Sequence, residues 1–165
     1  MLLLVAIEVC AIPKPGIYEI YYGDRALTTP GIGDIVLLPY SELPGPGAMW
    51  ELVHVDGKDQ VYIRFPGSNL CLTYEEPRAF NYLRALRGEP RPWTLLETHE
   101  EDMFMIQSPT TIDGEHIFAS RHPLPYRAGL DEPGSDYRKT WKFFYVSPAE
   151  NYDLAINQPN QISLS

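Results

Sequence analysis

Histidine, cysteine and carboxylate side chains are the groups that could perform catalysis or hold a metal, so their spacing is the first informative feature of this chain. No pair of histidines has a metal-ligand spacing on a recognisable element, and no cysteine lies near them in sequence. Carboxylate pairs such as Glu75–Glu76 and Glu100–Glu101 are adjacent, so on strands they would point to opposite faces. No nucleophile motif, phosphate-binding loop or dinucleotide fingerprint is present. We therefore predict no catalytic residue, no metal, no cofactor and no enzymatic activity. The histidines and cysteines are His54, His99, His116, His122, Cys10 and Cys71.

The composition predicts one all-β domain with an acidic surface. The chain has 165 residues, 16 prolines, 12 glycines and 20 aromatic residues, which is typical of many short strands joined by turns. The formal net charge of −9 leaves no basic face for a nucleic acid or an anionic membrane surface. No apolar stretch is long enough to span a membrane.

The N-terminal segment has two interpretations. Met1–Ile7 is apolar and Val9–Ala11 resembles a signal-peptide cleavage site, but no basic residue precedes the apolar run and Glu8 interrupts it. Residues 1–14 are therefore either a signal peptide, which implies secretion, or a leader or extra strand of the domain. The absence of an N-x-Ser/Thr sequence favours a cytoplasmic protein, and secretion stays the alternative.

Internal repetition is the strongest pattern in the sequence. Three strand-like segments open with an aromatic or β-branched residue, alternate apolar with polar residues, and begin 43 residues apart. Three further segments begin with the only three tryptophans, which are 43 and 48 residues apart. The opening segments are Tyr18–Ile20, Val61–Ile63 and Phe104–Ile106, and the tryptophans are Trp50, Trp93 and Trp141.

Each repeat has room for two more short strands between its opening strand and its tryptophan strand. The third repeat is five residues longer than the others, and we expect the surplus in the polar stretch Asp131–Thr140, where an insertion costs little. The expected additional strands are Arg25–Thr29, Asp34–Pro39, Asn69–Tyr74, Tyr82–Arg87, Glu115–Ser120 and Tyr126–Leu130.

Three four-stranded repeats predict a β-trefoil, a six-stranded barrel capped by three hairpins with pseudo-threefold symmetry. A propeller needs at least four blades. We place the domain at 15–148, with repeats at about 15–57, 58–100 and 101–148, and a C-terminal tail at 149–165. The tryptophans and the opening residues would form the barrel core. His54 and His99 are then expected to be solvated, and the acidic run Glu97–Asp102 is expected to be the loop that joins repeats two and three.

Several features together resemble the fungal β-trefoil protease inhibitors. They are the opening pattern Gly16–Ile20, the tryptophan strands, the acidic balance and the length. This group includes the mycocypins, such as clitocypin and macrocypin, which inhibit cysteine proteases, and the cospin-type inhibitors of trypsin-like serine proteases. The resemblance covers about Pro15–Val146. It implies a monomeric inhibitor used in fungal defence, whose partner is a papain-like, legumain-like or trypsin-like endopeptidase.

An inhibitor of this kind needs an ordered, exposed loop that fits a protease cleft. The segment Gln60–Asn69 is similar to the clitocypin strand and loop that carry a legumain-reactive asparagine. The resemblance therefore points to the loop Pro66, Gly67, Ser68 and Asn69, with Asn69 entering the pocket of an asparagine-specific protease. These residues also favour a plain turn, so both interpretations stay open.

Two other loop regions are candidates. Arg78, between Pro77 and Ala79, suits the acidic pocket of a trypsin-like enzyme, although a solvated loop arginine is the alternative. The cospin-type reactive stretch corresponds to Thr29–Asp34, which has no basic residue. Two small glycine-containing loops correspond to those by which mycocypins block papain-like proteases, and plain hairpin turns are the alternative. These loops contain Gly23 and Asp24, and Leu43, Pro44 and Gly45.

A carbohydrate-binding trefoil is the second function class. Ricin-B type lectins carry Gln-x-Trp in their repeats, but the residues two positions before the tryptophans here are Ala48, Arg91 and Lys139. We therefore predict an endopeptidase inhibitor first and a lectin second. Shallow pockets lined by Asp, Asn and aromatic side chains would favour the lectin.

Overall fold

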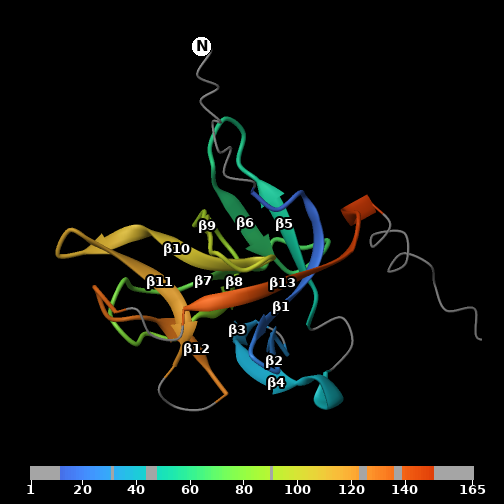
Figure 1. The fold of residues 1–165 in the computed structure, drawn as a ribbon, viewed down its shortest axis with the longest axis horizontal. Coiled ribbons are helices and arrows are strands. Elements are labelled where there is room, and N and C mark those ends of the chain that lie inside the picture. Colours follow the sequence, from blue (N-terminus) through green and yellow to red (C-terminus); the bar gives the residue numbers. More distant parts are fainter. Residues whose placement is uncertain are drawn as a thin grey trace, which may run out of the picture.

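The structure is a computed structural model that describes residues 12–30, 32–43, 48–89, 91–122, 126–135 and 139–150. Within this part, the chain forms thirteen strands and one short 3-10 helix (Figure 1). Repeat one contains β1 (Gly16–Tyr22), β2 (Arg25–Thr28), β3 (Gly33–Asp34), β4 (Val36–Pro39), the 3-10 helix η1 (Tyr40–Glu42) and β5 (Trp50–His54). Repeat two contains β6 (Val61–Arg64), β7 (Cys71–Thr73), β8 (Arg84–Leu86) and β9 (Thr94–Glu97). Repeat three contains β10 (Met103–Ile112), β11 (Glu115–Arg121), β12 (Ala128–Leu130) and β13 (Thr140–Ser147).

Six strands close into a barrel. Strand β1 pairs with β5 and β13, β5 pairs with β6, and β10 pairs with β9 and β13, all antiparallel. The remaining gap, between β6 and β9, is closed by an antiparallel bridge in which Val61 and Trp93 exchange two backbone hydrogen bonds of 2.8 Å. The barrel therefore leaves no unpaired edge along this ring of strands.

Three hairpins, β2–β4, β7–β8 and β11–β12, cap one end of the barrel. They are tied to one another by short pairings between β3 and β8, between Val36 and Arg127, and between Tyr82 and Gly129. In Figure 1 the β2–β4 hairpin lies at the bottom of the molecule, and the β5–β6 turn lies at the opposite end. The observed fold is the predicted β-trefoil.

The three tryptophans are related as the repeats predict. Each ring is fully buried, and each indole N–H donates to a backbone carbonyl of the cap hairpin in its own repeat. The distances from the indole nitrogen to the carbonyl oxygen are 2.8 Å for Trp50 to Leu27, 3.0 Å for Trp93 to Leu72, and 2.9 Å for Trp141 to Ala119. This repeated hydrogen bond fixes each cap hairpin to a barrel strand.

The opening residues also lie in the core, as expected. Tyr18, Val61 and Phe104 are 5%, 1% and 6% exposed. They belong to one continuous cluster with the tryptophans and with aliphatic residues of the cap. Burial of such large side chains is the main favourable term in folding. The described cysteine, Cys71, is a buried free thiol.

Two details of the predicted repeats were wrong. The first repeat has an extra strand, because buried Ile35 separates β3, which pairs with β8, from β4, which pairs with β2. The five surplus residues of repeat three are not in Asp131–Thr140. The acceptor carbonyl and the tryptophan are 23, 21 and 22 residues apart in the three repeats, so the length of that part is nearly constant. The surplus lies instead in the long β10–β11 hairpin.

His54 also differs from its expected place on the solvated surface. Its side chain is half-buried, and its Nε2 lies 2.8 Å from the carbonyl oxygen of Pro13. The Tyr18 hydroxyl donates to the next carbonyl, that of Lys14, at 2.8 Å. These bonds hold residues 13 and 14 against the barrel just before β1. Residues 1–11 lie outside the described part, so their two interpretations stay open.

The tryptophan hydrogen bond yields a stability prediction. We expect Trp93→Phe to lower the free energy of unfolding by about 2–4 kcal/mol, because it leaves the Leu72 carbonyl unpaired and a cavity beside it. Urea unfolding followed by circular dichroism measures this. The control Tyr40→Phe, on a 74% exposed side chain, should change stability by about 0.5 kcal/mol or less. Equal effects of the two substitutions would contradict the assigned role.

Asp131 yields a pH prediction. It is 3% exposed; its Oδ1 accepts the Phe118 N–H at 2.7 Å, and its Oδ2 has no described hydrogen-bond partner. Burial raises the pKa of this carboxyl, although the Phe118 N–H and the charge of Lys139 oppose the rise. The folded state therefore holds the proton more tightly than the unfolded state, and stability falls as pH rises above the ordinary carboxyl range. We expect the free energy of unfolding of Asp131→Asn to lack this dependence on pH. The free energies of variant and wild type should therefore converge at low pH, where Asp131 is protonated and uncharged. Parallel stability curves from pH 3 to 8 would argue against it.

Candidate functional site

The predicted loop residues lie on separate hairpins. Gly23 and Asp24 form the exposed β1–β2 turn, Asn69 is exposed at the end of the β6–β7 turn, and Arg78 is exposed in the β7–β8 connection. Leu43 is half-buried and packs against a small cluster of Tyr21, Ala26 and Ala48. Its predicted loop partners Pro44 and Gly45 lie outside the described residues.

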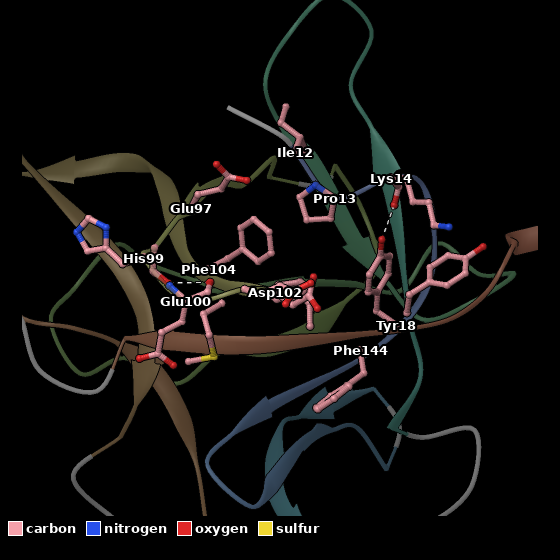
Figure 2. A pocket seen from close by; sticks show the side chains of 15 residues that line it. Ile12, Pro13, Lys14, Tyr18, Glu97, His99, Glu100, Asp102, Phe104 and Phe144 are labelled. Carbon is pink, nitrogen blue, oxygen red and sulfur yellow. Dashed lines mark hydrogen bonds between the residues drawn. The ribbon is translucent and has the colours of Figure 1, made fainter. Parts of the chain in front are cut away.

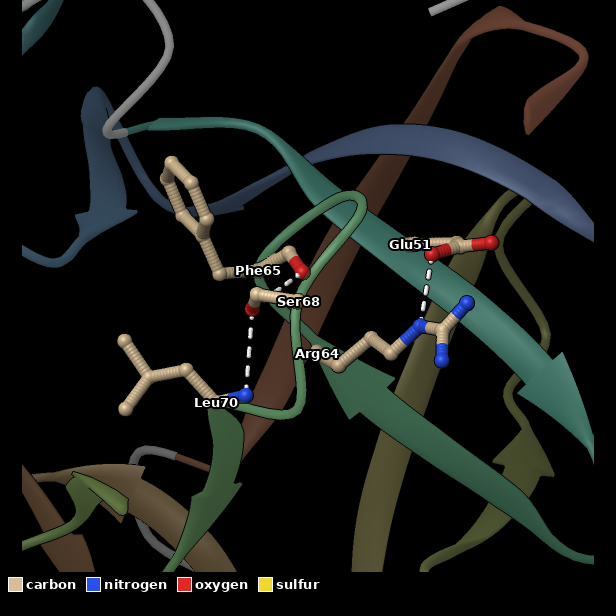
Figure 3. Close-up of polar contacts among 5 residues, drawn as sticks. All are labelled: Glu51, Arg64, Phe65, Ser68 and Leu70. Carbon is tan, nitrogen blue, oxygen red and sulfur yellow. Dashed lines mark hydrogen bonds and ion pairs between the residues drawn. The ribbon is translucent and has the colours of Figure 1, made fainter. Parts of the chain in front are cut away.

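The β6–β7 turn is held by a dense set of hydrogen bonds (Figure 3). The Ser68 hydroxyl donates to the Phe65 carbonyl at 2.8 Å and accepts the Leu70 N–H at 3.0 Å, while Phe65 N–H donates to the Leu70 carbonyl at 2.8 Å. Gly67 has a φ of 69°, a conformation that favours glycine, and Pro66 is buried beneath the turn. The turn therefore presents the Asn69 side chain on an ordered backbone.

Arg78 is held less firmly than the β6–β7 turn, because its side-chain contact is an exposed ion pair. Its Nε lies 2.9 Å from the Glu76 carboxylate, but the two side chains are 73% and 60% exposed. An exposed ion pair of this kind contributes little to stability. It partly neutralises the arginine that a trypsin-like pocket would have to recognise.

A small pocket of about 250 Å³ lies between repeats one and three, and we call it the Asp24 pocket. The β1–β2 turn and β4 form one side, and Arg121 at the end of β11 forms the other together with Tyr126. It is positioned by the cap pairings, because Leu37 N–H donates to the Tyr126 carbonyl at 2.7 Å across the two repeats. Its lining residues are Tyr22, Gly23, Asp24, Arg25, Leu37, Arg121 and Tyr126.

Aromatic rings and charges alternate around the Asp24 pocket. The Arg25 guanidinium lies 4.0 Å from the centre of the Tyr126 ring, and its Nη1 donates to the Leu37 carbonyl at 3.3 Å. The Arg121 guanidinium lies 6.0 Å from the centre of the Tyr22 ring. Tyr126 is 51% exposed and has a φ of 72°, so its ring is presented to solvent by an unusual backbone conformation. Asp24 is exposed beside them.

The three repeats have diverged at this place. Two positions after the carbonyl that accepts the tryptophan N–H stand Thr29, Tyr74 and Arg121 in repeats one, two and three. Tyr74 is buried, and its hydroxyl is hydrogen-bonded to Ser108 and Thr110 of repeat three, so a tyrosine fills the space there. Asp24 and Asn69 each lie three positions before the residue whose carbonyl accepts the tryptophan N–H, so they occupy equivalent positions in repeats one and two. The pocket is thus a property of one junction between repeats.

A larger cavity of about 630 Å³ lies at the other end of β1, and we call it the Asp102 cavity (Figure 2). It combines the predicted acidic turn between β9 and β10 with the residues before β1. The carboxylates of Glu97, Glu100, Glu101 and Asp102 line it together with Lys14. Figure 2 shows Asp102 between Phe104 and Tyr18.

The aromatic rings of the Asp102 cavity belong mainly to the barrel core. Tyr18, Phe104 and Phe143 are 6% exposed or less, and the Lys14 ammonium lies 3.7 Å above the centre of the more exposed Tyr145 ring. Burial, with smaller contributions from Tyr145 and Asp102, raises the pKa of Tyr18 to about 12, so its hydroxyl stays protonated and bonded to Lys14. This cavity therefore offers carboxylates together with the half-exposed rings of Phe144 and Tyr145.

Within the described ranges, potential metal ligands do not gather into a site, and the cysteine there is buried. No group of three or more His, Cys, Asp or Glu side chains there could hold a metal ion. Burial raises the pKa of the Cys71 thiol, which disfavours the nucleophilic thiolate. None of the described helices is long and apolar enough to cross a membrane.

Comparison with known proteins gives matches at the level of structure. No family model and no curated protein matches the sequence. The ricin B-like lectin of Macrolepiota procera, solved with lactose, matches with a TM-score of 0.66 and 19% identity over 82% of this chain and 99% of that one. The Rhizoctonia solani agglutinin matches with a TM-score of 0.61, 13% identity, 82% of this chain and 99% of that one. The Polyporus squamosus lectin, bound to a sialylated trisaccharide, matches at 0.60, with 15% identity, over 82% of this chain and half of the lectin chain.

These neighbours establish the β-trefoil fold, which they share with this chain at low identity. All three are fungal lectins by description, and none is described as a protease inhibitor. The sequence analysis selected Gly23 and Asp24 as part of a loop that could block a papain-like protease. It did not select Arg25, Arg121 or Tyr126. Arg121 and Tyr126 lie about 100 residues from Asp24 in sequence, so only the closure of repeat three onto repeat one brings them together.

Proposed function

We propose that this protein binds carbohydrate, without catalytic turnover, in the Asp24 pocket. The observation that carries the proposal is the junction of an exposed carboxylate with a half-exposed tyrosine in a pre-formed hollow. A carboxylate accepts hydrogen bonds from sugar hydroxyls, and an aromatic ring packs against the apolar C–H groups of a sugar ring. The small volume suits one sugar residue at the end of a chain.

The structural neighbours support this function class over inhibition, because they are lectins of the same fold. The Gln-x-Trp motif is absent here. The residues directly after the tryptophan-bonded carbonyls are small hydroxyl residues: Thr28, Thr73 and Ser120. All three are buried. Recognition must therefore use other residues, and the Asp24 pocket supplies them at the junction of repeats one and three.

A second candidate is protease inhibition through the β6–β7 turn, with a legumain-like endopeptidase as the partner. The observation that favours it is the set of hydrogen bonds around Ser68, which orders the turn before any contact with a protease. The Glu51–Arg64 ion pair, with 2.6 Å between the two groups, stiffens the strand that enters the turn. Little ordering entropy would then be lost on binding.

A glycan array with the wild-type protein, followed by calorimetry on the best ligand, tests carbohydrate binding. We expect Asp24→Ala to weaken binding about tenfold or more, because it removes charge-assisted hydrogen bonds to the sugar. The matched control is Asp56→Ala, an exposed aspartate in the β5–β6 turn at the other end of the barrel. Absence of any glycan ligand, or equal losses in the two variants, would refute the proposal.

An inhibition panel with papain, legumain and trypsin tests the second candidate. We expect Asn69→Ala to abolish inhibition of legumain and to leave inhibition of papain unchanged, because the loops that would reach papain lie on other hairpins. Arg78→Ala should affect only trypsin. Stability should change by about 0.5 kcal/mol or less, since Asn69 is exposed. If Asn69→Ala weakened inhibition of papain and legumain equally, the assignment to a separate turn would be wrong.

A further inference from the structure

Two arginines from different repeats line the Asp24 pocket. Arg25 begins β2 in repeat one, and Arg121 ends β11 in repeat three. Both are partly buried, and both lie near a tyrosine ring of the same pocket, Tyr126 for Arg25 and Tyr22 for Arg121. Arg25 is further held by its bond to the Leu37 carbonyl. The pocket therefore presents two guanidinium groups, and the hydrogen bond to Leu37 orients that of Arg25.

Neither arginine forms an ion pair with a described residue. The described arginines that do form ion pairs are Arg64, Arg78 and Arg127, with Glu51, Glu76 and Asp34. Asp24 lines the same pocket but does not lie within ion-pair distance of Arg25 or Arg121. Two partly desolvated guanidinium groups without a carboxylate partner are suited to an anion from solution.

The balance of charge in the pocket selects the kind of anion. Its lining holds two positive groups and one carboxylate, so it carries one net positive charge. The neighbouring His122 adds no charge at neutral pH, because burial lowers its pKa. A ligand with one negative charge and several neutral hydroxyls matches this arrangement. The anionic group would face the arginines, the hydroxyls would face Asp24, and the apolar side of the ring would meet Tyr126.

We propose, building on carbohydrate binding as the function of this pocket, that the Asp24 pocket selects sugars that carry a carboxylate. A planar guanidinium pairs with a carboxylate through two parallel hydrogen bonds, which gives direction as well as charge. The counterparts of Arg121 in the other repeats are Thr29 and Tyr74, neither of which carries a charge. The selectivity thus belongs to the junction of repeats one and three.

Paired ligands separate charge from shape. Methyl glucuronide and methyl glucoside share a sugar ring and differ in the carboxylate, and methyl galacturonide and methyl galactoside form a second pair. We expect the wild-type protein to bind the acidic member of each pair about tenfold or more tightly, as measured by NMR titration. This preference should shrink between 50 and 500 mM NaCl, while binding of the neutral member stays unchanged.

Arg121→Gln is the decisive variant, because glutamine keeps a planar polar end and removes the charge. It should abolish the preference for the acidic sugar, because it weakens binding of the acidic sugar far more than binding of the neutral sugar. Arg121→Lys should restore part of the preference, since it restores charge without the guanidinium fork. The matched control is Arg87→Gln, an exposed arginine after β8. Thermal unfolding of each variant checks that the fold is retained.

The outcomes separate this inference from the function on which it rests. If the protein binds the neutral sugars as tightly as the acidic ones, or if Arg121→Gln weakens both equally, the charge selection is wrong and carbohydrate binding stands. Preference for sulfated over carboxylated sugars would also overturn the carboxylate assignment. If the protein binds no sugar of either kind, carbohydrate binding itself fails, and the selectivity fails with it.

Discussion

The hydrogen bond from each tryptophan indole to a backbone carbonyl of its own cap hairpin is the interaction on which the rest of the structure depends. A tryptophan on a barrel strand can fill the barrel with its ring and still reach the cap with its N–H. Because both ring and acceptor are buried, water cannot replace the bond when it is lost. Three copies of this contact dock three hairpins onto one barrel, and the short pairings between the hairpins then lock the cap together.

This constraint explains why the repeats can differ so much at the surface. The number of residues between the acceptor carbonyl and the tryptophan is nearly constant, whereas the length before the acceptor varies freely. In repeat three the segment before the acceptor is lengthened and forms the long β10–β11 hairpin. Side chains just outside the docked core vary as well. Where repeat two places Tyr74 and closes the junction, repeat three places Arg121 and leaves a pocket.

The charge of the molecule gives that pocket its character. The chain carries a formal net charge of −9, and the Asp102 cavity is lined by four carboxylates and one lysine. The Asp24 pocket is the opposite, with two arginines and one aspartate. Both hollows lie along β1, one at its start and one at its end, so a single strand supports two surfaces of contrasting charge. Both hollows also offer aromatic surface, since Tyr126 in the Asp24 pocket is 51% exposed and Phe144 and Tyr145 at the Asp102 cavity are 49% and 40% exposed.

The sequence by itself determined the β-trefoil, the register of the tryptophans and the burial of the opening residues, because a core with threefold symmetry must repeat its large apolar residues at a fixed period. It could not locate the pocket. Its spacing placed Asp24 and Asn69 in turns, but Arg121 and Tyr126 are about 100 residues from Asp24, and nothing local indicates that they meet it. Closing the barrel between β13 and β1 brings repeat three against repeat one. Only that tertiary contact decides which charged side chains share a hollow, because surface residues are free of the periodic packing that makes the core predictable.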